Sequence, residues 1–215
     1  MFKKKSLFIT FEGVEGSGKT YQSKKLYKKI SKMKISAIYT REPGGTKGAE
    51  KIRDLILKDY FHKTPKEKFN KYTDTLLYLA ARNEHLEKKI RPAINKKKVI
   101  ICDRFTDSTL AYQVHGKKVN KGLIDYVHKI ILGNLKPDFT FVIKSQISKA
   151  MLRLNKRKNK NRYDKFSKKF YDNVQKSFIK IAKTNRNRYL VIDNTLDSSS
   201  AQKIIFNRFI KLLKK

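Results

Sequence analysis

A run of eight residues near the start of the chain has the types and spacing of a phosphate-binding loop. Gly13-Val14-Glu15-Gly16-Ser17-Gly18-Lys19-Thr20 has two glycines separated by four residues, followed by Lys and Thr. Glycines allow a tight turn that directs successive backbone N–H groups at one anion, and the helix that begins there adds its positive dipole end. We expect Lys19 to contact the outer phosphates and Thr20 to bind Mg²⁺. The alternative is a glycine-rich structural turn.

The residues on both sides of this loop favour the phosphate-binding interpretation. Residues 6–11, Ser-Leu-Phe-Ile-Thr-Phe, are a short apolar run typical of a strand. Residues 19–33 carry Leu26, Ile30 and Met33 at helical spacing. A strand, a glycine loop and a helix, in that order, are the context that a nucleoside-triphosphate site requires.

A second stretch with candidate chemistry is Asp103-Arg104-Phe105, at the end of the apolar run 99–103. An acidic residue at that end of a strand in a parallel sheet lies beside the glycine loop, where it can hold Mg²⁺ directly or through water. The guanidinium of Arg104 matches the oxygens of an acceptor phosphate. The alternative interpretation of Asp103 and Arg104 is a surface ion pair.

The order of apolar runs predicts the fold class. Five short runs have the composition of strands, and helical patterns lie between them: 6–11, 35–39, 99–103, 137–143 and 189–193. Alternating strands and helices predict an α/β domain with a mostly parallel five-stranded sheet, helices on both faces, and ligands at the carboxyl ends of the strands. We expect helices at about 46–58 and 68–90, a polar connection at 59–68, and one domain over residues 1–215.

Composition limits the remaining classes of function. No apolar run of about eighteen residues exists, so no membrane span is expected. Cys102 is the only cysteine, which excludes an intrachain disulfide and fits a cytoplasmic location. The formal net charge is +35. This charge fits a nucleic-acid-binding protein, but the lysines are scattered through nearly every segment, which favours a compositional bias without a specific nucleic-acid partner.

One segment concentrates basic residues. Residues 153–165 contain few apolar side chains and seven basic ones, among them Arg153, Lys156, Arg157, Lys158, Lys160 and Arg162. The functional interpretation is a basic lid that covers the transferring phosphates and excludes water. The alternative is the solvated end of a helix.

Taken together, these motifs resemble thymidylate kinase. The residues that carry the resemblance are 13–20, Arg41-Glu42-Pro43-Gly44-Gly45-Thr46, Tyr78-Leu79-Ala80-Ala81-Arg82, and 103–105 through Ala111-Tyr112-Gln113, in the family's order and spacing. The resemblance covers nearly the whole chain. It implies a three-layer P-loop NTPase fold with a basic lid, and transfer of the γ-phosphoryl group of ATP to dTMP with Mg²⁺. It also implies a homodimer, for which the helical segments 68–90 and 105–133 offer apolar faces.

The resemblance implies a role for individual residues. Residues 13–20 match the ATP-binding loop of the family. Thr20 and Asp103 match its Mg²⁺ ligands. Arg104 matches the arginine that holds the acceptor phosphate, and Glu15 matches the acidic residue near the acceptor sugar. The resemblance also assigns the other dTMP-binding residues. Arg53 matches a residue at the monophosphate, and Tyr78 matches the aromatic that stacks on thymine. Tyr112 matches the aromatic placed against a ribose 2′-hydroxyl, and the residues around the base are Arg82, Ser108, Thr109 and Gln113.

Gly16 occupies the loop position where other members carry a basic residue. Members with glycine there resemble the bacterial subgroup, which takes its catalytic arginine from the lid. The candidates are Arg153, Arg157 and Arg162, with Asn161-Arg162-Tyr163-Asp164 most similar to the lid end. The adenine contact is expected near residues 194–197.

Three other functions are weighed. Another nucleoside monophosphate kinase would share the loop and lid but differ in the base pocket. A nucleic-acid-binding ATPase would need a concentrated basic or aromatic surface. A GTPase switch is disfavoured because the chain has no Asn-Lys-x-Asp run.

Overall fold

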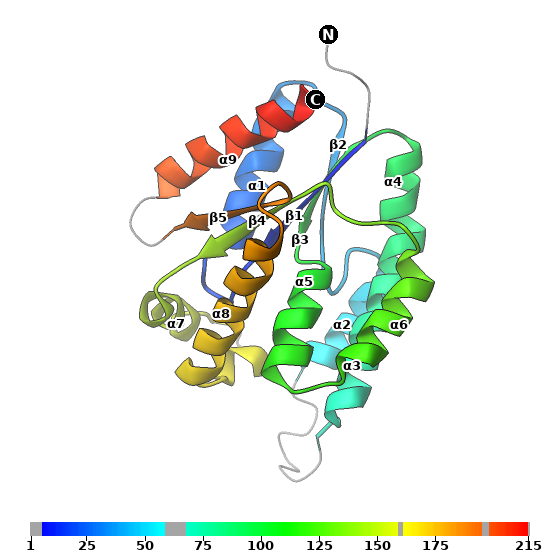
Figure 1. The fold of residues 1–215 in the computed structure, drawn as a ribbon, viewed down its shortest axis with the longest axis vertical. Helices are drawn as coiled ribbons and strands as arrows, with labels where there is room; N and C mark the ends of the chain where they lie inside the picture. The colour runs from blue at the N-terminus through cyan, green and yellow to red at the C-terminus, as the bar shows by residue number, and fades with distance from the viewer. Residues whose placement is uncertain (1–5, 59–67, 159–160, 195–197, 215) are drawn as a thin grey trace.

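A five-stranded sheet forms the centre of the structure, a computed structural model that describes residues 6–58, 68–158, 161–194 and 198–214 (Figure 1). Its strands are β1 (Leu7–Glu12), β2 (Ala37–Arg41), β3 (Val99–Asp103), β4 (Phe139–Lys144) and β5 (Tyr189–Asp193). They are arranged in the order β2-β3-β1-β4-β5, and each of the four neighbouring pairs is parallel. The predicted α/β class with a mostly parallel sheet is therefore confirmed.

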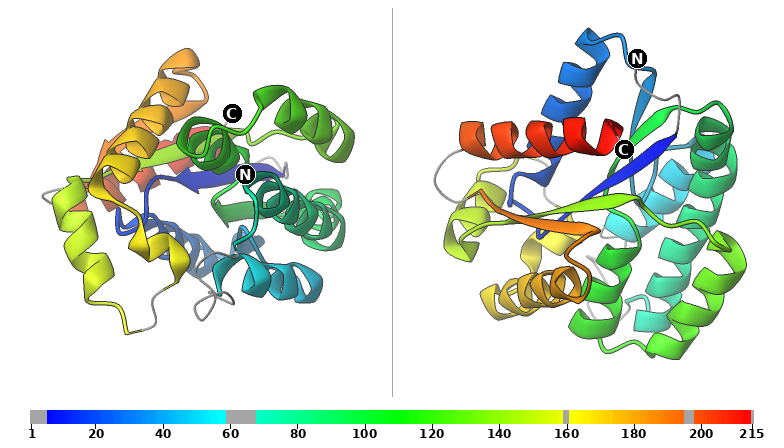
Figure 2. Two further views of the ribbon diagram at one scale, coloured as in Figure 1. Left: turned by 90° about the horizontal axis from the view of Figure 1, so that it is seen from below. Right: turned by 45° about the horizontal axis from the view of Figure 1, so that its top comes forward.

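Helices cover both faces of the sheet. On one face, α1 (Lys19–Lys32) and α9 (Ser198–Leu213) pack Leu26, Ile30, Ile205 and Phe209 against the strands. The other face carries α3 (Lys71–His85), η1 (Leu86–Ile90), α4 (Arg91–Asn95), α5 (Thr106–Thr109), η2 (Leu110–Gly116), α6 (Lys121–Leu132) and α8 (Lys168–Thr184). Figure 2 shows α1 and α8 on opposite sides of the sheet. Strands covered on both faces explain the continuous apolar runs.

Three shorter elements complete the described chain. Helix α2 (Lys47–Leu57) begins after Thr46, whose side chain accepts a hydrogen bond from the Ala49 N–H, and it packs against α3. Helix α7 (Ile147–Asn155) ends within the basic segment 153–165, and the 3₁₀ turn η3 (Arg162–Lys165) forms the other end of that segment. The predicted helix at 46–58 is confirmed within one residue at each end.

Several predicted boundaries were wrong. The second strand was expected at 35–39 but spans Ala37–Arg41, because Lys34 takes a left-handed φ of 57° and the chain must first turn out of α1. The helix expected at 68–90 begins at Lys71 after its cap Asn70 and continues through η1 and α4 to Asn95. The stretch 105–133 breaks between η2 and α6, where Lys118 has a φ of 58°. Most of the expected connection 59–68 lies outside the described residues.

The strand register brings the predicted site residues to one edge. Asp103 pairs with Phe11 of β1 and with Arg41 of β2, so the three strands end at the same level. The Arg104 N–H donates to the Phe11 carbonyl at 2.9 Å, and the Glu42 N–H donates to the Asp103 carbonyl at 3.0 Å. The loops that follow β1, β2 and β3 therefore lie side by side.

Candidate active site

A cavity of about 940 Å³ lies at the carboxyl edge of the strands. Its walls come from the loops after β1, β2 and β3, from helices α2 and α3, from the stretch 104–113, and from Arg157, Asn161 and Tyr163. It is lined by nearly all of the predicted side chains: Glu15, Lys19, Thr20, Arg53, Tyr78, Arg82, Asp103, Arg104, Ser108, Thr109, Tyr112, Gln113 and Arg157. Residues that are up to 142 positions apart in the sequence thus face one space.

The phosphate loop has a backbone that only glycine adopts readily. Gly13 has a φ of 142°, and a Cβ there would lie 2.5 Å from the Ile143 carbonyl oxygen. The buried Lys19 donates from Nζ to the Val14 carbonyl at 3.3 Å. Burial, followed by the charge of Arg104, lowers the pKa of Lys19 to about 8, although the Asp103 carboxylate opposes the change. A phosphate at this position would supply the negative charge that the ammonium needs.

Thr20 and Asp103 meet at the end of β3. The Thr20 hydroxyl donates to Asp103 Oδ2, while Asp103 Oδ1 is buried and has no hydrogen-bond partner among the described residues. A carboxylate oxygen and a hydroxyl are ligands that Mg²⁺ takes in proteins, with water and substrate phosphates completing its shell. The described residues contain no cluster of three or more His, Cys, Asp or Glu side chains suited to a metal. Thr20 and Asp103 therefore fit an ion that is bound partly by the protein and partly by the nucleotide.

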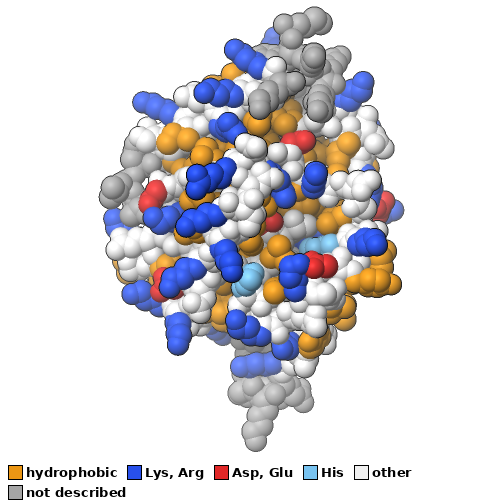
Figure 3. All heavy atoms as spheres, in the orientation of Figure 1, with side chains coloured by type: hydrophobic (Ala, Val, Ile, Leu, Met, Phe, Trp, Pro, Cys, Tyr) orange, Lys and Arg blue, Asp and Glu red, His pale blue; other side chains and the backbone are white. Residues whose placement is uncertain are grey.

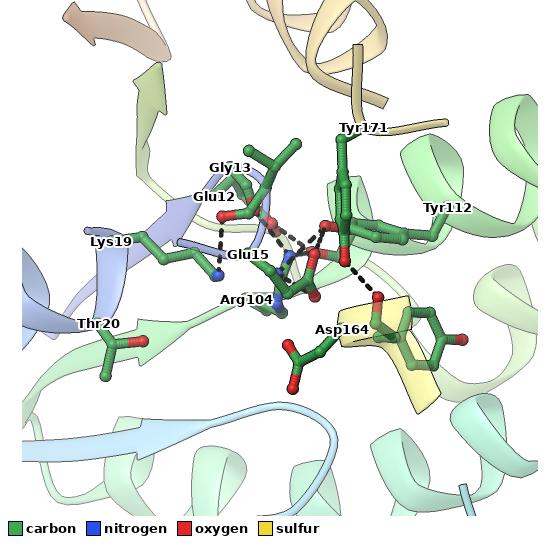
Figure 4. A network of polar contacts seen from close by, with 12 residues as sticks. Glu12, Gly13, Glu15, Lys19, Thr20, Arg104, Tyr112, Asp164 and Tyr171 are labelled. Carbon is green, nitrogen blue, oxygen red and sulfur yellow. Dashed lines mark hydrogen bonds and ion pairs between the residues drawn. The ribbon is translucent and has the colours of Figure 1, made fainter. Parts of the chain in front are cut away.

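Arg104 forms the centre of the polar network in Figure 4. Its Nη1 donates to the Gly13 carbonyl at 2.9 Å and to Ser108 Oγ at 3.0 Å, and its Nη2 donates to Glu15 Oε1 at 2.8 Å. The Tyr112 hydroxyl donates to the other oxygen of Glu15. In Figure 4, Lys19 and Tyr112 point toward this centre from opposite sides.

Charges in this network keep Glu15 ionised. Burial alone would raise the pKa of Glu15, but the charges of Arg104 and Lys19 outweigh it and lower that pKa below its usual value. Burial would lower the pKa of Arg104, but Glu15, Tyr112, Asp103 and Glu12 together outweigh burial and raise that pKa. Arg104 also has a left-handed φ of 75°, which holds its side chain over the loop.

Tyr78 and Arg82 project from successive turns of α3 into the other end of the cavity. Arg82 is 3% exposed and donates from Nε to Glu42 Oε2 at 2.8 Å and from Nη1 to Thr109 Oγ1 at 2.8 Å. Its Nη1 also donates to His128 Nε2 at 2.7 Å. Burial and the nearby Arg82 charge lower the pKa of His128 to about 3, so this histidine is neutral and accepts.

Two buried glutamates, Glu12 and Glu42, support the site, although no individual role was expected for them from the sequence. Glu42 joins Arg82 to His85 Nδ1, which lies 3.0 Å from Glu42 Oε1. Burial raises the pKa of Glu42, but the charges and hydrogen bonds of Arg82 and His85 together outweigh burial and lower that pKa. Glu12 accepts from the Phe105 N–H at 2.7 Å and contacts Ser108 Oγ at 2.6 Å. Glu12 ends an apolar strand just as Asp103 does, and that signal was available in the sequence.

The three lid candidates have different surroundings. Arg153 donates to the Gly16 carbonyl at 2.9 Å, and Arg157 donates to Asp164 Oδ1 at 3.0 Å. Arg162 forms an ion pair with Asp74 on α3. Of these three arginines, Arg157 lines the cavity.

The region expected to contact adenine is described only at Asn194, because residues 195–197 lie outside the described residues. Asn194 donates from Nδ2 to the Ser17 carbonyl at 2.9 Å, and it accepts from Gln22 Nε2 at 3.0 Å. The chain after β5 is thereby tied to the phosphate loop.

Comparison with known proteins agrees with this geometry. The family model "Thymidylate kinase" matches residues 11–205. Thymidylate kinase from Wolbachia pipientis subsp. Culex pipiens is 38% identical over 97% of this chain and 96% of the relative. The enzyme of that name from Orientia tsutsugamushi is 43% identical over 86% of this chain and 84% of the relative. A crystal structure of thymidylate kinase from Ehrlichia chaffeensis is 33% identical, superposes with a TM-score of 0.74, and covers 97% of this chain and 99% of its own. The chain belongs to the thymidylate kinase family, and it is therefore an ATP-dependent phosphotransferase.

Proposed function

We propose that the cavity holds ATP and dTMP end to end, and that the chain transfers the γ-phosphoryl group of ATP to dTMP to give dTDP and ADP. Membership of the family implies this reaction. The observation that carries it is that Lys19, Arg104 and Arg82 line one cavity. A site with Arg82 or Arg104 on the opposite face of the sheet from Lys19 would not bring two nucleotides together.

Residues 13–20 bind the phosphates of ATP through backbone N–H groups and Lys19. Thr20 and Asp103 hold Mg²⁺, Asp103 directly or through water, and the buried free oxygen of Asp103 supports this assignment. When bound, the ion neutralises charge on the donor phosphates and helps to orient them.

Arg104 and Arg53 bind the 5′-phosphate of dTMP. Both line the cavity, and Arg53 is fixed by donation from Nη1 to the Pro43 carbonyl at 2.7 Å. The acceptor phosphate is already an anion at neutral pH, so no general base is required, and catalysis rests on positioning and charge neutralisation. Arg157 is the lid arginine that we place beside the transferring phosphoryl group, because it lines the cavity.

Thymine and deoxyribose are recognised at the other end. Tyr78 stacks on the base, and Arg82, Ser108, Thr109 and Gln113 surround it. Gln113 supports this, because its Nε2 is buried without a hydrogen-bond partner among the described residues and so has donors to offer a base carbonyl. Glu15 faces the sugar, and Tyr112 excludes a 2′-hydroxyl.

A panel of nucleoside monophosphates in a coupled ADP-release assay tests this proposal. We expect dTMP to have the highest kcat/KM, and a preference for guanylate, cytidylate or adenylate would overturn the base assignment.

The nucleic-acid-binding ATPase is not favoured. In Figure 3, Lys and Arg side chains are spread over the visible face and do not form one stripe. That alternative predicts ATP hydrolysis stimulated by polynucleotides, which the same assay measures.

The chain acts as one domain and forms a homodimer in the cytoplasm in this proposal. Helices α3 and α6 carry exposed apolar side chains, with Leu76 at 50%, Tyr126 at 67% and Ile130 at 65% exposure. Burial of such side chains favours association. In the described ranges, no helix is both long enough and apolar enough to cross a membrane.

A further inference from the structure

Asp74 lies in the first turn of α3 and is almost completely buried, with a side chain that is 1% exposed. It precedes Tyr78 by four residues and Arg82 by eight, so it occupies the same side of the helix, one and two turns earlier. The proposed reaction uses Tyr78 and Arg82 but gives Asp74 no role. A buried carboxylate without partners is strongly unfavourable, so the groups that contact Asp74 indicate its role.

The partners of Asp74 come from two other segments. Lys117, after η2, approaches Oδ2 at 2.5 Å, and Arg162 of η3 forms an ion pair with Oδ1. The Tyr163 hydroxyl donates to Oδ2 at 3.3 Å and also accepts from Lys117 Nζ at 3.0 Å. One buried carboxylate thus fixes the stretch 161–166, called the latch segment below, to the helix that carries the base-binding residues.

The latch segment forms part of the cavity. The ring of Tyr163 lies edge-on to those of Tyr78, at 6.2 Å between centroids, and Tyr112, at 6.0 Å. Tyr163 and Asn161 both line the cavity. The Tyr171 hydroxyl of α8 donates to the Tyr163 carbonyl, which adds a further contact that holds the latch segment.

The same segment also sets the position of the proposed lid arginine. Asn161 and Asp164 form a reciprocal capping box, in which Asp164 Oδ2 accepts from the Asn161 N–H at 3.0 Å. The other oxygen of Asp164 accepts from Arg157 Nη1 at 3.0 Å. Asp74 is therefore linked, through the latch segment, to both ends of the cavity.

We infer that Asp74 is a positioning residue that holds the latch segment against α3. Through this contact the latch segment completes the wall of the dTMP site and orients Arg157 toward the phosphates. The inference rests on the proposed function. It gives Arg162 a role other than contact with phosphate, because the guanidinium holds the latch segment to Asp74. Both Tyr78 and Tyr163 line the cavity, so dTMP bound against them would strengthen the same closure.

Steady-state kinetics on Asp74→Asn, Arg162→Gln and the double variant test the inference. Each single change removes one charged partner, and we expect the KM for dTMP to rise about tenfold or more, with a much smaller change in the KM for ATP. The double variant should be no worse than Asp74→Asn, because both changes break one contact. Asp74→Glu, which keeps the charge, should recover part of the lost dTMP affinity. Asp54→Asn, in an exposed pair with Lys58, is the matched control and should behave as wild type.

Hydrogen–deuterium exchange gives a readout that does not depend on activity. In Asp74→Asn and Arg162→Gln, the amides of residues 163–166 should exchange faster than in the wild type, while those of β1 and β3 should be unchanged. If Asp74→Asn does not fold, the inference is tested by Arg162→Gln alone, because the Arg162 side chain is partly exposed and its replacement is less disruptive to the core.

An unchanged KM for dTMP in folded Arg162→Gln, additive effects in the double variant, or unchanged exchange at 163–166 would each overturn the inference. Wild-type protein without dTMP kinase activity would instead refute the proposed function, and the exchange comparison would still test the latch.

Discussion

Replacement of the buried Glu12 by Gln should change how stability depends on pH. Burial, followed by the negative charge of Asp107, raises the pKa of Glu12 from 4.5 to about 8. The folded protein therefore keeps a proton that the unfolded chain releases above pH 4.5. In the structure the Glu12 carboxyl accepts from the Phe105 N–H and from the Ser108 hydroxyl. When protonated, the carboxyl can instead donate to Ser108 Oγ, and the amide of a glutamine can contact the same two groups.

The magnitude follows from the two pKa values. The contribution of Glu12 to the free energy of unfolding is complete below about pH 4.5 and is lost as the pH rises through about 8. Each pH unit inside this window corresponds to about 1.4 kcal/mol, so wild-type stability should fall by about 3 kcal/mol between pH 5.5 and 7.5 from this group alone. Gln at position 12 does not titrate. The two proteins share all other ionisable groups, so the difference between them reports Glu12 together with its effect on the neighbouring Asp107.

Urea denaturation followed by far-UV circular dichroism, at constant ionic strength, measures this difference. The free energy of unfolding of Glu12→Gln should increase relative to the wild type from pH 5 to 8 and level off above that. Glu87→Gln is the matched control, because Glu87 is half exposed and pairs with Arg91 on the surface. A difference between Glu12→Gln and the wild type that stays constant across the window would show that Glu12 is ionised in the folded protein, and would refute the reasoning.

Three further predictions concern catalysis, specificity and assembly. Arg104→Ala should lower kcat by about 10³-fold or more in steady-state assays while the circular dichroism spectrum is retained, and near-normal turnover would remove Arg104 from the mechanism. Tyr112→Ala should lower the dTMP to UMP ratio of kcat/KM, whereas Tyr112→Phe, which keeps the ring, should preserve it; equal ratios in all three proteins would contradict the assignment. Ile130→Glu on α6 should convert the dimer to monomers in size-exclusion chromatography with light scattering. Ile204→Glu, at an exposed position on α9, is its control, and a dimer in both variants would place the interface elsewhere.

The fold could be predicted from the sequence because its main signals are local. Each strand is a short apolar run, and a helical pattern lies between successive runs, so parallel pairing follows from chain geometry. The phosphate loop and Asp103-Arg104 could also be placed, since both follow directly from strand ends. The errors lie at boundaries that depend on backbone conformation, such as Lys34 and Lys118 with positive φ, which apolar periodicity does not report.

The supporting contacts of the site could not be predicted, because each joins residues that are distant in sequence. Arg82 was assigned to the base, yet its orientation is set by Glu42, 40 residues earlier, and by His128, 46 residues later. No pattern in the sequence pairs these groups. The same limit applied to the lid, where the sequence offered Arg153, Arg157 and Arg162 and pointed most to the stretch around Arg162, whereas Arg157 lines the cavity. The different partners of Arg157 and Arg162, Asp164 and Asp74, are a property of the folded chain.

The distribution of buried charge bears on the interpretation of the high net charge. The buried polar side chains of the described residues include five acidic residues but only two basic ones, Lys19 and Arg82. The acidic residues are Glu12, Glu42, Asp74, Asp103 and Asp107. Because acids are concentrated inside, the surface is more basic than the formal +35 suggests. Both substrates are polyanions, and a positive surface potential raises their local concentration near the cavity. The excess of lysine is therefore compatible with a nucleotide kinase, and it requires no nucleic-acid partner to explain it.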